Sequence, residues 1–91
     1  MAKNIDVCSD WHGTSQEDFN FTNHNSTDVT VCAATNQTWP FNIASPITVP
    51  AKGGGSPGKI AVSLLQLPNG TYTYDVDGCI TGGQPKSVTI P

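Results

Sequence analysis

The chain has 91 residues, of which 12% are charged, and its formal net charge is −3. This length suits a single domain over residues 1–91, with room for one hydrophobic core and too little for two. The acidic balance and the absence of arginine argue against the basic surface that nucleic-acid binding needs. No run of about 18 apolar residues predicts a membrane-spanning helix.

Alternation of apolar and polar residues, rich in β-branched and aromatic side chains, predicts strands along most of the chain. The predicted strands cover residues 4–8, 18–22, 28–33, 46–50, 59–67, 70–78 and 86–90. The polar segment 9–18 is predicted to be a loop. Residues 39–41 can form a short strand only at a sheet edge, because Pro40 cannot donate a ladder hydrogen bond.

These strands, spaced by roughly ten residues and without a predicted helix, indicate an all-β fold, a small antiparallel Greek-key β-sandwich. The apolar segment 59–67 has a pattern that also fits a helix, but the glycines beside it and Pro68 favour a strand. The glycine-rich segment 53–58 is predicted to be an exposed hairpin loop without a functional role. We expect Trp39 and Phe41 to close one end of the sandwich. One of Tyr72 and Tyr74 is expected to bond through its hydroxyl to the backbone near the preceding turn.

The segment Leu67-Pro-Asn-Gly-Thr-Tyr-Thr-Tyr-Asp-Val76, followed by Pro85-Lys-Ser-Val-Thr-Ile90, resembles the closing strands of cupredoxins and related immunoglobulin-like sandwiches. Phe19-Asn-Phe-Thr-Asn-His24 is similar to an early strand of these families. Copper-binding cupredoxins draw a cysteine, a histidine and usually a methionine from the loop between the last two strands. Here Val76 stands where the cysteine is expected, and neither His nor Met follows Cys79. The resemblance implies the architecture without copper, and no cofactor is expected.

The three cysteines, Cys8, Cys32 and Cys79, lack the spacing of a zinc site. Their positions on the predicted strands favour a disulfide between Cys32 and Cys79, because neighbouring strands or sheets can bring two Cα atoms to the required distance of about 5.5 Å. Cys8 is then free or bonded to another chain. Other pairings, and three reduced thiols in a cytoplasmic protein, are the alternatives.

Four Asn-x-Ser/Thr sequons suit an exported chain, as the cysteines do. They begin at Asn20, Asn25, Asn36 and Asn69. The N-terminus lacks the apolar stretch of a signal peptide after Lys3, so we expect a mature domain with an added start methionine. The expected location is extracellular or at the cell surface, with the cytoplasm as the alternative.

A partial metal or redox site is the alternative function that the sequence offers. Cys8, Asp10 and His12 place a thiol, a carboxylate and an imidazole within five residues, and Cys79 could add a further ligand. Catalysis is not expected, because a Cys/His dyad also needs an orienting group and an oxyanion hole that this local spacing does not supply.

The expected function is therefore that of a non-catalytic structural or interaction module, such as a secreted or surface-assembly subunit. A protein partner or a second copy would pair with its edge strands, because an unprotected edge pairs readily. The predicted edges contain Ile47 and Val49, between two prolines, and the segment 5–7. Trp11 and His12, in the polar loop, are the other predicted contacts for a protein or a carbohydrate.

Overall fold

The structure, a computed structural model, describes residues 3–79 and 85–91. These residues form eight strands in two mixed sheets. The strands are β1 (Lys3–Asp6), β2 (Trp11–His12), β3 (Asp18–Asn23), β4 (Val29–Ala33), β5 (Ile47–Val49), β6 (Gly58–Ser63), β7 (Gly70–Asp77) and β8 (Lys86–Ile90). The predicted all-β class is confirmed.

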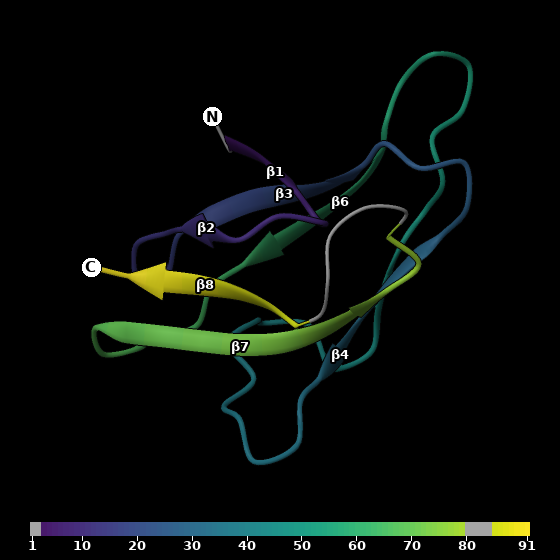
Figure 1. Ribbon diagram of the computed structural model, residues 1–91. Coiled ribbons are helices and arrows are strands. Elements are labelled where there is room, and N and C mark those ends of the chain that lie inside the picture. Colours follow the sequence, from purple (N-terminus) through teal and green to yellow (C-terminus); the bar gives the residue numbers. More distant parts are fainter. Residues whose placement is uncertain (1–2, 80–84) are drawn as a thin grey trace.

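One sheet has three strands in the order β1-β3-β6, and the other has five in the order β2-β8-β7-β4-β5. Figure 1 shows the three-stranded sheet lying above the five-stranded one. The N-terminal segment contributes to both, because β1 belongs to the first sheet and β2 to the second. Segment 9–18, predicted to be a loop, therefore contains a short strand.

Two of the strand pairs, β1 with β3 and β2 with β8, are parallel, and the others are antiparallel. The predicted purely antiparallel arrangement is thus corrected, since alternation shows which face of a strand is buried but not the direction of its neighbour. The predicted edge strand at 39–41 is reduced to an isolated bridge between Phe41 and Leu64. Phe19 and Phe21 of β3, which alternate with polar residues in the sequence, are buried in the core.

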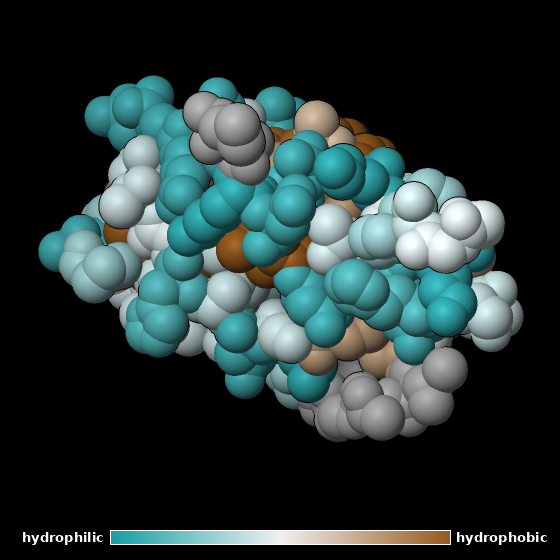
Figure 2. Space-filling model, turned by 90° about the horizontal axis from the view of Figure 1, so that it is seen from above, coloured by the Kyte–Doolittle hydropathy of each residue, from teal (hydrophilic) through white to brown (hydrophobic). Residues whose placement is uncertain are grey.

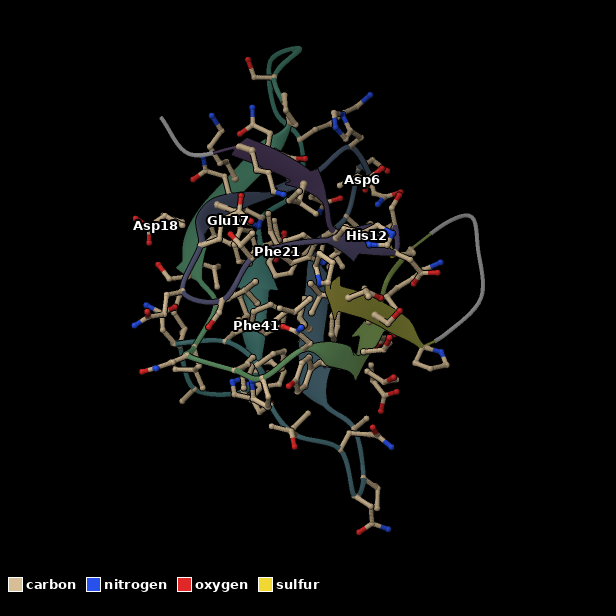
Figure 3. All side chains as sticks on the ribbon, turned by 90° about the vertical axis from the view of Figure 1, so that its left-hand side faces the viewer. Asp6, His12, Glu17, Asp18, Phe21 and Phe41 are labelled. Carbon is tan, nitrogen blue, oxygen red and sulfur yellow. A yellow bond between two sulfur atoms is a disulfide. The ribbon has the colours of Figure 1, made fainter. Side chains whose placement is uncertain are left out.

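An aromatic cluster occupies the centre of the core. The rings of Phe19 and Phe21 meet edge-on with centroids 4.9 Å apart, and Phe41 lies 5.3 Å from Phe21 and 5.1 Å from Tyr74. Figure 3 shows Phe21 and Phe41 pointing into the interior of the molecule. Burial of each such side chain contributes about 1.5–3 kcal/mol. Trp39 is half-buried and packs on Phe41, with centroids 5.1 Å apart.

The expected tyrosine contact with the turn is made by Tyr72. Its hydroxyl donates a hydrogen bond to the carbonyl oxygen of Pro68, 2.6 Å away. Tyr74, two residues later, is fully buried, and its hydroxyl accepts a hydrogen bond from the indole nitrogen of Trp11. Tyr72 thus bonds to the turn before β7, and Tyr74 bonds to Trp11 within the core.

A disulfide joins Cys8 to Cys79, with Cα atoms 5.8 Å apart, and Cys32 is a free, half-buried cysteine. The predicted Cys32–Cys79 pairing is thereby corrected. Cys32 lies opposite Asp75 in the β4–β7 ladder, and Cys79 comes four residues after Asp75, about 13 Å along an extended chain. Cys32 thus lies on β4, and Cys79 comes just after the end of the neighbouring strand β7. The two cysteines lie too far apart along these strands to form a disulfide.

Candidate functional site

The side chains predicted as contacts for a partner differ in their exposure to solvent. Trp11, Ile47 and Val49 are buried, with exposed fractions of 8%, 1% and 0%. A partner would therefore meet the backbone of their strands and not these side chains. His12 is exposed on the short strand β2.

His12 borders a hollow of about 210 Å³ that is also lined by Lys3, Gly13, Thr14, Glu17 and Pro91. The ammonium group of Lys3 lies 3.2 Å from a carboxylate oxygen of Glu17 and donates a hydrogen bond of 2.9 Å to the carbonyl of His12. Partial burial disfavours the charged form of Glu17, but the hydrogen bond from Thr14 and the nearby Lys3 outweigh it and lower the pKa of this carboxyl. The two charged groups of the hollow thus neutralise each other.

The disulfide bears on the predicted metal site, which counted Cys8 as a thiolate ligand. Cys8 is bonded to Cys79, and a disulfide sulfur lacks the thiolate that binds a metal. A carboxylate oxygen of Asp10 accepts a hydrogen bond of 2.9 Å from the backbone of Ser87. Across residues 3–79 and 85–91, no three His, Cys, Asp or Glu side chains are grouped so that they could hold a metal ion.

The four sheet edges remain as candidate binding surfaces, because an edge strand carries unpaired backbone groups. They are formed by β1 and β6 in one sheet and by β2 and β5 in the other. The predicted placement of 47–49 and of the N-terminal strand at edges is confirmed. The backbone hydrogen bonds show how much of each edge is open.

The edge of β2 is capped by a side chain. Trp11 and His12 pair with β8 on one side, and the backbone of Gly13 continues this pairing by donating to Thr89. The carbonyl of His12 accepts a hydrogen bond from Lys3. A lysine in this place is a common protection of a strand edge.

The edge of β5 is closed by prolines. The N–H of Ala51 donates to the carboxylate of Asp28, next to β4, at 2.9 Å. Since successive residues of a strand direct their backbone groups to opposite sides, Thr48 faces the open side together with Pro46 and Pro50. Proline has no N–H, so Thr48 alone offers a donor along Pro46–Pro50.

The edge of β1 is partly occupied by the turn that follows it. The N–H of Val7 donates to Thr22 of β3 at 3.0 Å, so Asn4 and Asp6 face the open side. The carbonyl of Asp6 accepts from Ser9 at 3.1 Å, and its carboxylate accepts from the backbone of Cys8 at 2.9 Å. Asn4 is left as the most accessible residue of this edge.

The edge of β6 is the longest, and among residues 3–79 and 85–91 the cover of its backbone is Asn42, at the end of the strand. Ser63 exchanges two hydrogen bonds of 2.9 Å with Asn42: its N–H donates to the side chain of Asn42, and its carbonyl accepts from the backbone of Asn42. Ser63 therefore faces away from β3. By alternation, Lys59 and Ala61 also direct their N–H and C=O groups to the open side, and both residues are exposed.

A hollow of about 330 Å³ lies beside this edge. It is lined by Asp18, Phe19, Asn20, Asn42, Ala61, Val62 and Ser63. Asp18 is the charged side chain of this lining, and its carboxylate accepts a hydrogen bond from the hydroxyl of Ser63. Figure 3 shows Asp18 at the side of the molecule, pointing outward. In Figure 2, hydrophilic residues cover most of the face seen from above.

Comparison of the chain with protein families, with characterised proteins and with solved structures found no match. Among the residues that the structure describes, no helix is long and apolar enough to cross a membrane.

Sequence reasoning missed Lys59, Ala61, Asn42 and Asp18 as site residues. The alternation of segment 59–63 does place Lys59 and Ala61 on the outer face. It carries no signal that this strand lies at an edge, because strand order depends on contacts distant in sequence. Asn42 directly follows residues 39–41, where a short edge strand was expected.

Proposed function

We propose that this chain is a non-catalytic interaction module that binds a partner by adding a strand to the open edge of β6. The observation that carries the proposal is the outward direction of the backbone groups of Lys59 and Ala61, next to the hollow that contains Asp18. Of the other three edges, that of β2 is capped by Lys3 and that of β1 is partly occupied by the turn that follows it. The prolines leave one outward donor, Thr48, on the edge of β5. Strand addition gives affinity through the backbone and specificity through side-chain hollows beside the edge.

The binding strength expected from this edge is modest. Two outward-facing residues offer two N–H and two C=O groups, and each hydrogen bond contributes about 0.5–1.5 kcal/mol net. A protein strand fits this site better than a carbohydrate, because sugars are commonly gripped by exposed aromatic rings and Phe19, the aromatic residue of the lining, is 1% exposed.

We also propose that the fold is an immunoglobulin-like Greek-key sandwich. The bond from the Tyr72 hydroxyl to Pro68 supports it, since such sandwiches often anchor a tyrosine of the penultimate strand to the backbone a few residues upstream. The parallel pairing of β1 with β3 departs from an antiparallel sandwich. For location we propose the outside of the cell or its surface, because the Cys8–Cys79 disulfide suits an oxidising compartment.

A library of short peptides displayed on phage tests the binding proposal. Peptides selected on the immobilised domain are expected to lose binding to Ala61→Pro, because proline removes an outward N–H without touching the bonds to β3. Thr48→Pro, the same change on the edge of β5, is the matched control and should leave binding intact. Nuclear magnetic resonance should show the amide protons of Lys59 and Ala61 protected from exchange when a peptide is bound. Selected peptides that bind both variants equally would refute the proposal.

A further inference from the structure

We infer that the partner strand is the β6 strand of a second copy of this chain, placed antiparallel about a two-fold axis next to Ile60. This inference rests on the proposed function and names the occupant of the open edge. Joining the two edges would make one continuous six-stranded sheet from two three-stranded ones.

The register follows from which backbone groups are free. In an antiparallel pair, two outward-facing residues must lie opposite each other to exchange hydrogen bonds. A centre at Ile60 places Lys59 opposite the partner's Ala61, and by symmetry Ala61 opposite the partner's Lys59. Each pair exchanges two hydrogen bonds, so all four free backbone groups of each edge are used.

The two neighbouring registers fail for physical reasons. A centre at Lys59 would set this ammonium group directly against the partner's Lys59, and like charges directly opposite are destabilising. A centre at Ala61 would require the backbone of Ser63 to pair with the partner's Lys59, but Asn42 already bonds both of its groups. The register centred on Ile60 avoids both conflicts.

Side chains on both faces are complementary in this register. On the outer face, Lys59 lies over the partner's Ala61, whose small side chain borders the hollow containing Asp18. The ammonium group of Lys59 of one copy therefore lies next to the hollow that contains the Asp18 carboxylate of the other copy. On the inner face, half-buried Ile60 lies opposite the partner's Ile60. These two residues form a non-hydrogen-bonded pair, in which side chains lie closer than in a hydrogen-bonded pair.

The strands can pair only over this short stretch. Pro57 has no N–H to extend the ladder, and Ser63 is occupied by Asn42 at the other end. Interfaces below about 1,200 Å² in total are typically weak and transient. We therefore expect a concentration-dependent dimer with a dissociation constant between about 10 μM and about 1 mM.

Analytical ultracentrifugation over that concentration range tests the inference. The unmodified chain should pass from monomer to dimer, and Ala61→Pro should raise the dissociation constant at least tenfold. Thr48→Pro should leave it unchanged. Circular dichroism and the melting temperature of each variant verify that the monomer is folded.

A charge exchange tests the register. Lys59→Glu sets two carboxylates together and should weaken the dimer, as should Asp18→Lys, which sets two ammonium groups together. Combining both substitutions in one chain should restore most of the affinity at low salt. A dimer that is indifferent to both the proline and the charge variants would overturn the inference.

The outcome also separates this inference from the proposed function. A chain that stays monomeric at about 1 mM, while selected peptides still require an intact Ala61 edge, overturns the second copy as partner and leaves strand addition standing. If no peptide depends on that edge either, both proposals are wrong.

Discussion

The indole N–H of Trp11 donates a hydrogen bond of 2.9 Å to the hydroxyl of Tyr74, 63 residues later in the chain. Both side chains are buried, and their contact ties the short strand β2 to the centre of the five-stranded sheet. The oxygen of Tyr74 is the acceptor for this indole. A buried donor that loses its acceptor is left with an uncompensated loss of hydration.

Tyr74→Phe should therefore destabilise the domain by about 1–3 kcal/mol, because it removes this acceptor while keeping the ring. Urea unfolding followed by tryptophan fluorescence measures the change. Tyr72→Phe is the matched control on the same strand and should cost less, since Pro68 is exposed and water can replace the lost donor. Equal losses for the two variants would contradict this role of Tyr74.

Stability is expected to fall in alkaline solution because of the same residue. Burial raises the pKa of the Tyr74 hydroxyl, and the hydrogen bond from Trp11 offsets only part of this effect. Above a pH of about 10, the unfolded chain loses this proton while the folded chain keeps it. The folded state then binds more protons, so the free energy of unfolding decreases as pH rises. Unfolding curves between pH 9 and about 11 should show a smaller decrease for Tyr74→Phe than for the unmodified chain.

Much of the core was predictable because long strands carry a clear period of two. Phe19 and Phe21 on β3, and Tyr74 and Val76 on β7, alternate with polar residues and are buried. Trp11 was not predictable in this way. It is the one inward residue of a two-residue strand, so there is no repeat from which its burial could be inferred.

The candidate site was less predictable than the core, because it depends on which strands lie at an edge and on what covers them. The prolines around Ile47 and Val49 correctly indicated an edge. They also leave Thr48 as the one outward donor between Pro46 and Pro50, so the residues that locate this edge also limit its pairing. The open edge at Lys59 and Ala61 depends on two features that are not visible in the sequence. One is the position of β6 at the end of its sheet, and the other is Asn42, which covers only Ser63 among the described outward-facing residues.

The Cys8–Cys79 disulfide should contribute strongly to stability. It links residues 71 apart in the chain, and closure of a loop of this size stabilises by about 4 kcal/mol in the chain-entropy model. Replacing both cysteines by serine should lower the free energy of unfolding by about this amount. Cys32→Ser, at a half-buried free thiol, is the control and should have a much smaller effect.

Peptide mapping without reduction provides the direct measurement of the pairing. The expected product joins the peptide that contains Cys8 to the peptide that contains Cys79, and one thiol per chain should react with an alkylating reagent. Recovery of a peptide joining Cys32 to Cys79 would contradict the structure and restore the pairing that the sequence suggested.

Gly58 is required by a close approach of two backbones at the start of β6. The sequence predicted that it belongs to an exposed hairpin loop, but in the structure it is buried and pairs with Asn23 in the ladder. A Cβ atom at this position would overlap with the carbonyl oxygen of Pro50. Gly58→Ala should thus force the β5–β6 connection apart and destabilise the domain by about 1–3 kcal/mol or more.

Gly53→Ala is the matched control within the same segment, because a Cβ there meets nothing within 4 Å. We expect the free energy of unfolding of this variant to lie within about 0.5 kcal/mol of that of the unmodified chain, as is usual for surface substitutions. Thermal unfolding of both variants measures the difference. The large effect at Gly58 and the small one at Gly53 would locate the structural constraint at the beginning of β6, next to the edge that we propose as the binding site. If instead both alanine variants melt like the unmodified chain, the backbones of β5 and β6 are not held together at Pro50, and the geometry of the open edge must be reconsidered.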